Sequence, residues 1–553
     1  MAFGFGMLGS AVERTVKKTT ELAVNAGSKA VDMAIGEDRK NRMVADFLNT
    51  LAEAPGAADL LTNAAAALVQ KVTPAPMARL LESLCGALDL LKPEVLLTTM
   101  VKMTRTVVKA ILKDATHVFT IRKGVLSNEL TGATIQFLWD QRHEVVNFLV
   151  DVIECAKGYV KSDSLTGKRH QLDEHGLDNE LDLRDPMNRH ALLCQVQRLV
   201  KSVVYILTQL PQPLKFEEIN MTAETQLLTD SIHSGAIVKV TPSGSQILQA
   251  IPDASVKDLR RDSAVGEMMA NGNGVQKKMV NGEPRRAVNG VADPSNPSPA
   301  DHSDAKVTDE KWIFVNGIGT ELYWLHLACK KLAKRYSRDV TGVYNRGDGI
   351  LWDLIECAGQ RNRDGDRNTQ SQENMVQTTA SSKAAQKELV NQLENALMQA
   401  EVGNKYKYVV MIAHSQGCLV LRLALETLLH RNSSMVRDAM RNRLCVFTFG
   451  NPSVDWHGKL DDVLRTEHFA NEKDFVAKLG VLKDDKQSPT ERGFDNVFVN
   501  REKEWVGHLF GTQYSLKTEH YTDDLDTKGS KRSWLLNCRE GESLDAARKR
   551  LVA

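Results

Sequence analysis

The stretch Val409-Val-Met-Ile-Ala-His-Ser-Gln-Gly-Cys-Leu-Val420 decides how the second half of the chain folds. Its apolar first part, with Tyr408, predicts a strand buried on both faces of a sheet. The apolar run from Leu419 to Leu429 follows at helical length and predicts a helix. Only Ala413-His-Ser415-Gln-Gly417 separates the two elements, so the chain has to turn sharply at Ser415.

A strand-to-helix turn of this kind can raise a serine hydroxyl above the edge of a sheet, where it acts as a nucleophile. The turn is crowded by neighbouring backbone and requires small residues two positions before and after the serine. Ala413 and Gly417 meet that requirement, although glycine is commoner at the first position. We therefore predict Ser415 as a nucleophile. The alternative is a serine that only caps a helix.

A second strand and loop strengthen this prediction. Trp312 to Val315 predicts a strand that ends in Asn316-Gly-Ile-Gly319 and is followed by a helix from Glu321 to Tyr336. Acyl transfer needs two donors that converge on the developing oxyanion. We expect the Ile318 amide, in a loop with Gly317, to join the Gln416 amide in an oxyanion hole. The alternative is an ordinary tight turn.

Alternation of short apolar runs and helices continues through the C-terminal half. Further strands are predicted at Val340–Tyr344 and Leu444–Phe449, with a helix at Ala384–Ala400 between them. Asn345-Arg-Gly-Asp-Gly349 is interpreted as a loop. The pattern predicts an α/β domain over 311–553, with a mostly parallel sheet covered by helices on both faces.

Two motifs beyond the serine carry a resemblance to a known family. They are Thr448-Phe-Gly-Asn-Pro-Ser-Val454 and Asn471-Glu-Lys-Asp-Phe-Val476, and a Gly-flanked His508 follows them. On these residues the region from about Lys311 to Tyr521 resembles lipase-type α/β-hydrolases. The resemblance implies a triad in which Asp474 is the acid and His508 the base, with no metal or organic cofactor.

Other residues could fill these two roles. Asp455 follows the preceding strand and is an alternative acid, and His520 is an alternative base. His414, next to the nucleophile, is interpreted as structural. The assignment further requires that the Ser415 hydroxyl has an imidazole nitrogen within reach and is not walled off.

The remainder of the chain divides by composition. Residues 1–230 are rich in Ala, Leu and Val at helical spacing and predict an all-α domain. Short strands are expected at Ala236–Val240 and Gln246–Ile251. The stretch 256–310 is dense in Asn, Gly, Pro and Ser, so we expect a disordered linker, because it cannot bury enough apolar surface to offset its ordering entropy.

Charge and cysteine usage narrow the partners and the compartment. Lys plus Arg (71) and Asp plus Glu (70) nearly cancel, so no global field favours nucleic acid. The eight scattered cysteines suit a reducing, cytoplasmic setting. Residues 10–35 and Val95 to Lys113 predict amphipathic helices that pack on their own domain or, alternatively, contact a membrane peripherally.

The expected function is that of an intracellular serine carboxylic-ester hydrolase that acts on lipid esters through an acyl-enzyme. Two alternatives remain open. The same triad could catalyse thioester hydrolysis or acyl transfer, or the fold could serve as a lipid-binding scaffold without turnover.

Overall fold

The computed structural model describes mainly the C-terminal half of the chain. The described ranges are 309–346, 349–361, 380–403, 406–431, 433–456, 460, 462–483, 490–501, 507–523 and 533–552, preceded by 234–244, 246–249 and short pieces between 141 and 195. Nearly all of the predicted linker and the predicted helices at 10–35 and 95–113 lie outside these ranges. The all-α domain over 1–230 therefore stays a prediction.

The described strands form one mostly parallel sheet in the order β2-β1-β4-β3-β5-β6-β7-β8-β9. The six central strands, from β4 to β8 in that order, are parallel, and β1 and β9 pair antiparallel to them on either side. The strands are β1 Ile237–Val240, β2 Gln246–Gln249, β3 Glu310–Val315, β4 Val340–Val343, β5 Tyr408–His414, β6 Leu444–Phe449, β7 Arg465–Asn471, β8 Val497–Asn500 and β9 Thr522–Asp523.

Side chains alternate between the two faces of this sheet and build a core on each. In β3, Ile313 and Val315 join one cluster of buried apolar residues, whereas Trp312 and Phe314 join the other. This is the period of two that a strand buried on both faces must show. Both clusters are lined by helices, so the C-terminal region is an α/β unit.

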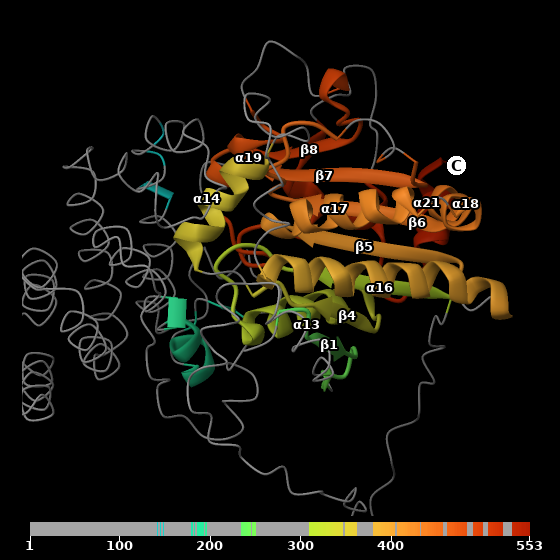
Figure 1. Ribbon diagram of the computed structural model, residues 1–553, viewed down its shortest axis with the longest axis horizontal. Helices are drawn as coiled ribbons and strands as arrows, with labels where there is room; N and C mark the ends of the chain where they lie inside the picture. The colour runs from blue at the N-terminus through green and yellow to red at the C-terminus, as the bar shows by residue number, and fades with distance from the viewer. Residues whose placement is uncertain are drawn as a thin grey trace, which may run out of the picture.

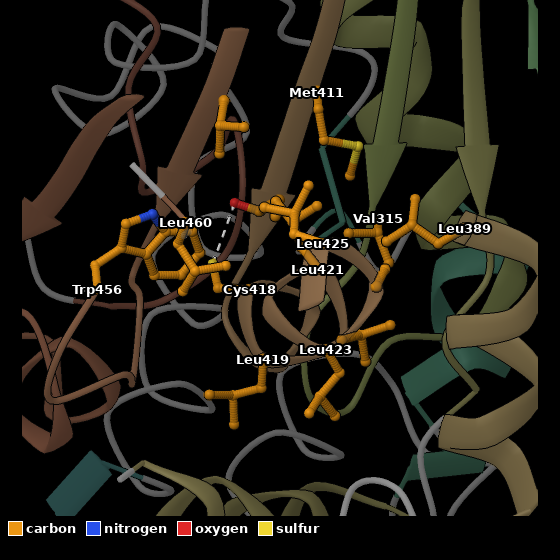
Figure 2. Close-up of a cluster of buried hydrophobic side chains, with 14 of the residues drawn as sticks. Val315, Leu389, Met411, Cys418, Leu419, Leu421, Leu423, Leu425, Trp456 and Leu460 are labelled. Atoms are coloured by element: carbon orange, nitrogen blue, oxygen red, sulfur yellow. Dashed lines mark hydrogen bonds between the residues drawn. The ribbon is translucent and has the colours of Figure 1, made fainter. Parts of the chain in front are cut away.

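Figure 1 shows two of these helices, α16 and α17, running side by side across the sheet. Their apolar side chains, among them Leu389, Leu421 and Leu425, lie in one cluster with Val315 of β3 and Met411 of β5 (Figure 2). The helices are α13 Leu322–Tyr336, α14 Ile350–Gln360, α16 Ala380–Gly403, α17 Gln416–His430, α18 Ser434–Arg443, α19 Phe475–Leu479, α20 Trp534–Asn537 and α21 Leu544–Val552.

The structure extends the predicted unit in two places. The sheet reaches back to Ile237, in front of the start at residue 311, because β1 pairs with β4 across its whole length. The stretch after the predicted loop at Asn345 to Gly349 forms α14, whose N-terminal turn follows Gly349 directly. In the described part of the chain, no helix combines the length and apolar character that a membrane span requires.

Candidate active site

The predicted site residues meet at the carboxyl ends of the parallel strands. β3 and β5 are neighbours, while β4 lies beyond β3 and β6 lies beyond β5. The chain order reverses between β3 and β5, and such a point leaves a crevice outside the strand ends in open α/β sheets. The Gly317–Ile318 loop leaves β3 at this point, and Ser415 leaves β5 beside it.

Ser415 occupies a strained turn between β5 and α17. Its φ of 57° and ψ of −128° place a non-glycine residue in a region that L-residues rarely adopt. The Ser415 amide donates to the carbonyl oxygen of Phe449 at 2.8 Å, which ties the turn to the end of β6. The buried strand and the buried helix on either side therefore force the conformation that the sequence predicted.

Two glycines let the loop after β3 lie directly against Ser415. A Cβ atom on Gly317 would stand 2.2 Å from the Ser415 Cβ and 2.8 Å from its Oγ. A Cβ atom on Gly417 would stand 2.6 Å from the Asn316 carbonyl oxygen. Gln416 is the first residue of α17, so its amide has no partner within the helix. Gly317 and Gln416, two of the three residues predicted for an oxyanion hole, thus lie next to Ser415, and Ile318 follows Gly317 in the same loop.

The predicted acid and base form a buried pair. His508 Nδ1 lies 2.8 Å from Asp474 Oδ2, and both side chains are almost fully buried. A carboxylate only accepts, so Nδ1–H donates and Nε2 is left as the acceptor. Asp474 Oδ1 accepts from the Val476 amide at 2.9 Å, because Asp474 is also the N-cap of α19. The carboxylate is therefore fixed by its own helix.

Tyr514 adds a second donor to the same carboxylate oxygen. Its hydroxyl donates to Asp474 Oδ2 at 2.5 Å. Burial, reinforced by the neighbouring Asp474 charge, raises the pKa of Tyr514 well above its ordinary value, so the phenol keeps the proton that it donates. Gly450 leaves room for this cluster, since a Cβ there would stand 2.9 Å from Asp474 Oδ2 and 3.2 Å from His508 Cε1.

The loop that carries His508 is held through its backbone. Gln513 Oε1 accepts from the amides of His508 and Leu509, at 2.6 and 2.8 Å. His414 Nε2 donates to the His508 carbonyl at 2.7 Å, and the two rings lie 4.6 Å apart between centroids. Burial lowers the pKa of His414 well below its ordinary value, so this ring is neutral. His414 thus contacts the backbone of the His508 loop, and its interpretation as a structural residue stays a prediction.

Ser415 Oγ and His508 Nε2 are both buried, and neither has a hydrogen-bond partner among the described residues. The Ser415 side chain has no solvent exposure, and His508 is 3% exposed. Phe148, from the N-terminal half, packs edge-on against the His508 ring with centroids 5.6 Å apart. The Ser415 hydroxyl is therefore enclosed and makes no hydrogen bond to an imidazole nitrogen, so the structure as it stands does not meet the two conditions that the sequence analysis set for it.

The alternative acid, Asp455, and the alternative base, His520, do not share the hydrogen bond between Asp474 and His508. The carboxylate that His508 contacts is that of Asp474 rather than Asp455. His520 lies in a short 3-10 helix, where its Nδ1 is 2.7 Å from Ser515 Oγ. The structure thus pairs Asp474 with His508, as the sequence analysis selected, and the hydrogen bond from Ser415 to His508 that would complete the group is not formed.

Sequence reasoning missed the residues that hold this group in place. Tyr514 and Gln513 follow His508 by six and five positions, and only their spacing from a candidate base could have drawn attention to them. Phe148 lies far upstream in the chain, and no local pattern connects it with His508. In the described ranges, no three His, Cys, Asp or Glu side chains gather in a way that could hold a metal ion.

Compared with protein-family models, curated proteins and solved structures, the chain matches none.

Proposed function

We propose that this protein is a serine hydrolase of the α/β-hydrolase class that cleaves carboxylic esters, with lipid esters as the expected substrates. One observation carries the proposal. Ser415 Oγ and His508 Nε2 are two of the buried polar atoms that lack a hydrogen-bond partner in the described part of the chain, and they are the donor and acceptor that a triad requires. Asp474 contacts the other ring nitrogen of His508, Nδ1. In substrate-free sites such catalytic hydrogen bonds are often long.

The geometry supports a two-step mechanism. Ser415 Oγ attacks the ester carbonyl while His508 Nε2 takes its proton, and Asp474 holds the imidazole tautomer and stabilises the cation. The amides of Ile318 and Gln416 stabilise the oxyanion. His508 then returns the proton to the leaving alcohol, and water deacylates Ser415 through the same base. Apart from the attacking water, the groups that act in these steps are side chains and backbone amides of this chain.

The enclosed hydroxyl sets a further requirement. An ester can reach Ser415 only after the residues that enclose its side chain move. Burying the reacting groups strengthens their electrostatic interactions once the substrate is bound. The proposal therefore requires opening before acylation.

The test is labelling of the full-length protein with a fluorophosphonate probe. Labelling should be lost in Ser415→Ala and should slow on the order of 10⁴-fold in Asp474→Asn, because the imidazole tautomer is no longer fixed. Asp455→Asn and His520→Asn serve as matched controls and should label like the wild type. A wild-type chain that stays unlabelled in detergent as well as in buffer would refute the proposal.

Thioester hydrolysis or acyl transfer remains an alternative for the same three residues. The acyl-enzyme is common to both, and only the acceptor differs. Turnover of ester and thioester substrates with one acyl chain, each with and without an added alcohol, separates these activities. A scaffold without turnover would show neither labelling nor product.

A further inference from the structure

Helix α14 carries two buried carboxylates that approach the proposed oxyanion hole from one side. Asp353 and Glu356 lie three positions apart on the helix, so they share a face. Asp353 has no solvent exposure, and Glu356 is 4% exposed. Buried carboxylates are costly unless they are hydrogen-bonded, so their partners indicate what they are there to hold.

Asp353 holds the loop that follows β3. Its Oδ2 accepts from the Gly319 amide at 2.9 Å. Gly319 has a φ of +58°, which closes the turn immediately after Ile318. Because the peptide unit is planar, the hydrogen bond from the Gly319 amide also fixes the Ile318 carbonyl, and the Ile318 amide lies on the preceding peptide unit, one Cα away.

Glu356 holds the residue that follows the nucleophile. Its Oε2 accepts from Gln416 Nε2 at 2.6 Å, and Gln416 Oε1 accepts from Asn345 Nδ2 at 2.8 Å. Asn345 is in turn joined to the loop after β3, since its amide donates to Asn316 Oδ1 at 2.8 Å. The Gln416 side chain is therefore fixed at both its oxygen and its nitrogen.

Helix α14 is itself anchored to the nucleophile helix. Arg422 of α17 is fully buried, and its Nη2 donates to the Gln360 carbonyl at 2.7 Å. Its Nη1 donates to the Arg361 carbonyl at 3.4 Å. A guanidinium at the C-terminal carbonyls of a helix stabilises that end. The helix thus connects the β3 loop, Gln416 and the body of α17.

We infer that Asp353 and Glu356 are positioning residues that set the two amides of the oxyanion hole, an inference that rests on the proposed function. The two hydrogen bonds lead to the Gly319 amide and the Gln416 side chain, which adjoin the proposed donors, and not to the Asp474–His508 pair. Their effect is on donors that must stand about 3 Å from the developing oxyanion. A misplacement of about 1 Å can cost about 10²-fold in rate.

The experiment compares kcat and KM of Asp353→Ala and Glu356→Ala with those of Asp353→Asn and Glu356→Gln. We expect the alanine variants to lose about 10- to 100-fold in kcat with KM little changed, because an oxyanion contact acts mainly in the transition state. The amide variants keep an acceptor and should recover most of the loss. Glu310→Gln, a buried carboxylate at the opposite end of β3, is the matched control and should keep the wild-type kcat.

Two readouts separate positioning from general structural damage. Affinity for a trifluoromethyl ketone, which forms a tetrahedral adduct with Ser415, should fall in proportion to kcat/KM. The midpoint of the pH profile of kcat/KM should stay unchanged, because the Asp474–His508 pair is untouched. A ketone affinity that stays at the wild-type value while kcat falls would contradict the inference.

If the Glu356→Ala variant does not fold, the inference can be tested by exchanging the two side chains of the Glu356–Gln416 hydrogen bond. Gln416→Glu alone places two carboxylates together and should lower kcat. The double variant Gln416→Glu with Glu356→Gln again pairs one amide with one carboxylate, so its kcat should recover. A double variant with a kcat no higher than that of Gln416→Glu would overturn the inference. If the wild type is not labelled at Ser415, the proposed function and this inference both fail; if it is labelled and both alanine variants turn over normally, only the inference fails.

Discussion

At the scale of single residues, the backbone of Ser415 is strained. Its backbone adopts a φ of 57°, a value that costs a non-glycine residue about 1–3 kcal/mol. Among the described residues, the other non-glycine with positive φ is Ser337, a helix C-cap in the left-handed region at 54° with ψ 50°. Ser415, with ψ −128°, lies outside that more accessible region. The strain is maintained by the buried elements on both sides of the turn.

We expect Ser415→Gly to be more stable than Ser415→Ala, by about 1 kcal/mol. Both variants remove the hydroxyl and abolish probe labelling, but glycine relieves the φ strain that alanine retains. Chemical denaturation of the two variants measures the difference. A glycine variant less stable than the alanine variant would show that the turn is not strained.

At the scale of elements, the site depends on how closely the β3 loop approaches the start of α17. Gly417 is in a helix, where alanine would ordinarily add about 1 kcal/mol of stability. Here its missing Cβ leaves room for the carbonyl oxygens of Asn316 and Val315, which would stand 2.6 and 2.8 Å away. These are backbone atoms of a central strand end and have little freedom to move.

Gly417→Ala should therefore destabilise the protein by about 2–3 kcal/mol, the cost of overpacking a core, and should slow labelling at Ser415. Gly541→Ala is the comparison, because Gly541 has a φ of +73° but no heavy atom within 4 Å of where an alanine Cβ would lie. That variant should lose only about 1 kcal/mol from backbone strain and should label normally. Equal losses in the two variants would contradict the close-approach argument.

At the scale of the molecule, a piece of the N-terminal half is docked on the α/β unit by buried polar contacts. Lys331 of α13 is fully buried and donates to Glu180 at 2.6 Å and to Thr512 at 2.7 Å. Tyr323 donates to Asp185, and Trp324 donates to Asn188. Thr512 lies in the loop that carries His508, so this docking reaches the candidate site.

Glu180→Ala should lower the free energy of unfolding by about 3–5 kcal/mol, because it leaves the Lys331 ammonium buried without its carboxylate. Adding Lys331→Met should recover most of the loss, since the uncompensated charge is then gone. Denaturant unfolding of the single and double variants measures both effects. A double variant as unstable as Glu180→Ala would show that the cost does not come from the buried charge.

Buried imidazoles predict how stability depends on pH. Burial lowers the pKa of His468 from its ordinary value of 6.5 to about 3. The unfolded chain takes up this proton below pH 6.5 while the folded chain does not, so stability present above pH 6.5 is lost as the pH falls toward 3. The slope from this residue is at most about 1.4 kcal/mol per pH unit.

His468→Asn should reduce that slope. The asparagine keeps a polar atom near Thr448 Oγ1, which lies 2.6 Å from His468 Nδ1 in the wild type, but it takes up no proton. Unfolding free energies of both chains are measured from pH 7 to pH 4. The raised pKa values of the buried Glu310 and Glu467 act in the opposite direction and are common to both chains, so they cancel in the comparison. Parallel curves would contradict the prediction.

Individual strands and helices show which parts of the fold could be predicted from the sequence and which could not. The unbroken apolar runs of β3 and β5 predict strands buried on both faces, and the structure confirms the predicted strand Leu444–Phe449 to the residue. Helix α14 was not predicted from the sequence, because a glycine-rich loop precedes it and the helix is only 11 residues long. β1 belongs to the sheet only through its pairing with β4, which lies more than 90 positions later in the chain, and no local pattern encodes such a pairing.

The sequence by itself determined the turn at Ser415 and the chain order of a serine, an acid and an imidazole, because a strand–turn–helix and its small residues are local features. Only the tertiary structure decided that Asp474, rather than Asp455, faces His508, and that Tyr514, Gln513 and Phe148 surround the pair. Contacts between residues far apart in the chain follow from how helices and loops pack over the sheet, and packing depends on all of them together. The enclosure of the Ser415 hydroxyl belongs to this second kind, since it arises from several segments at once.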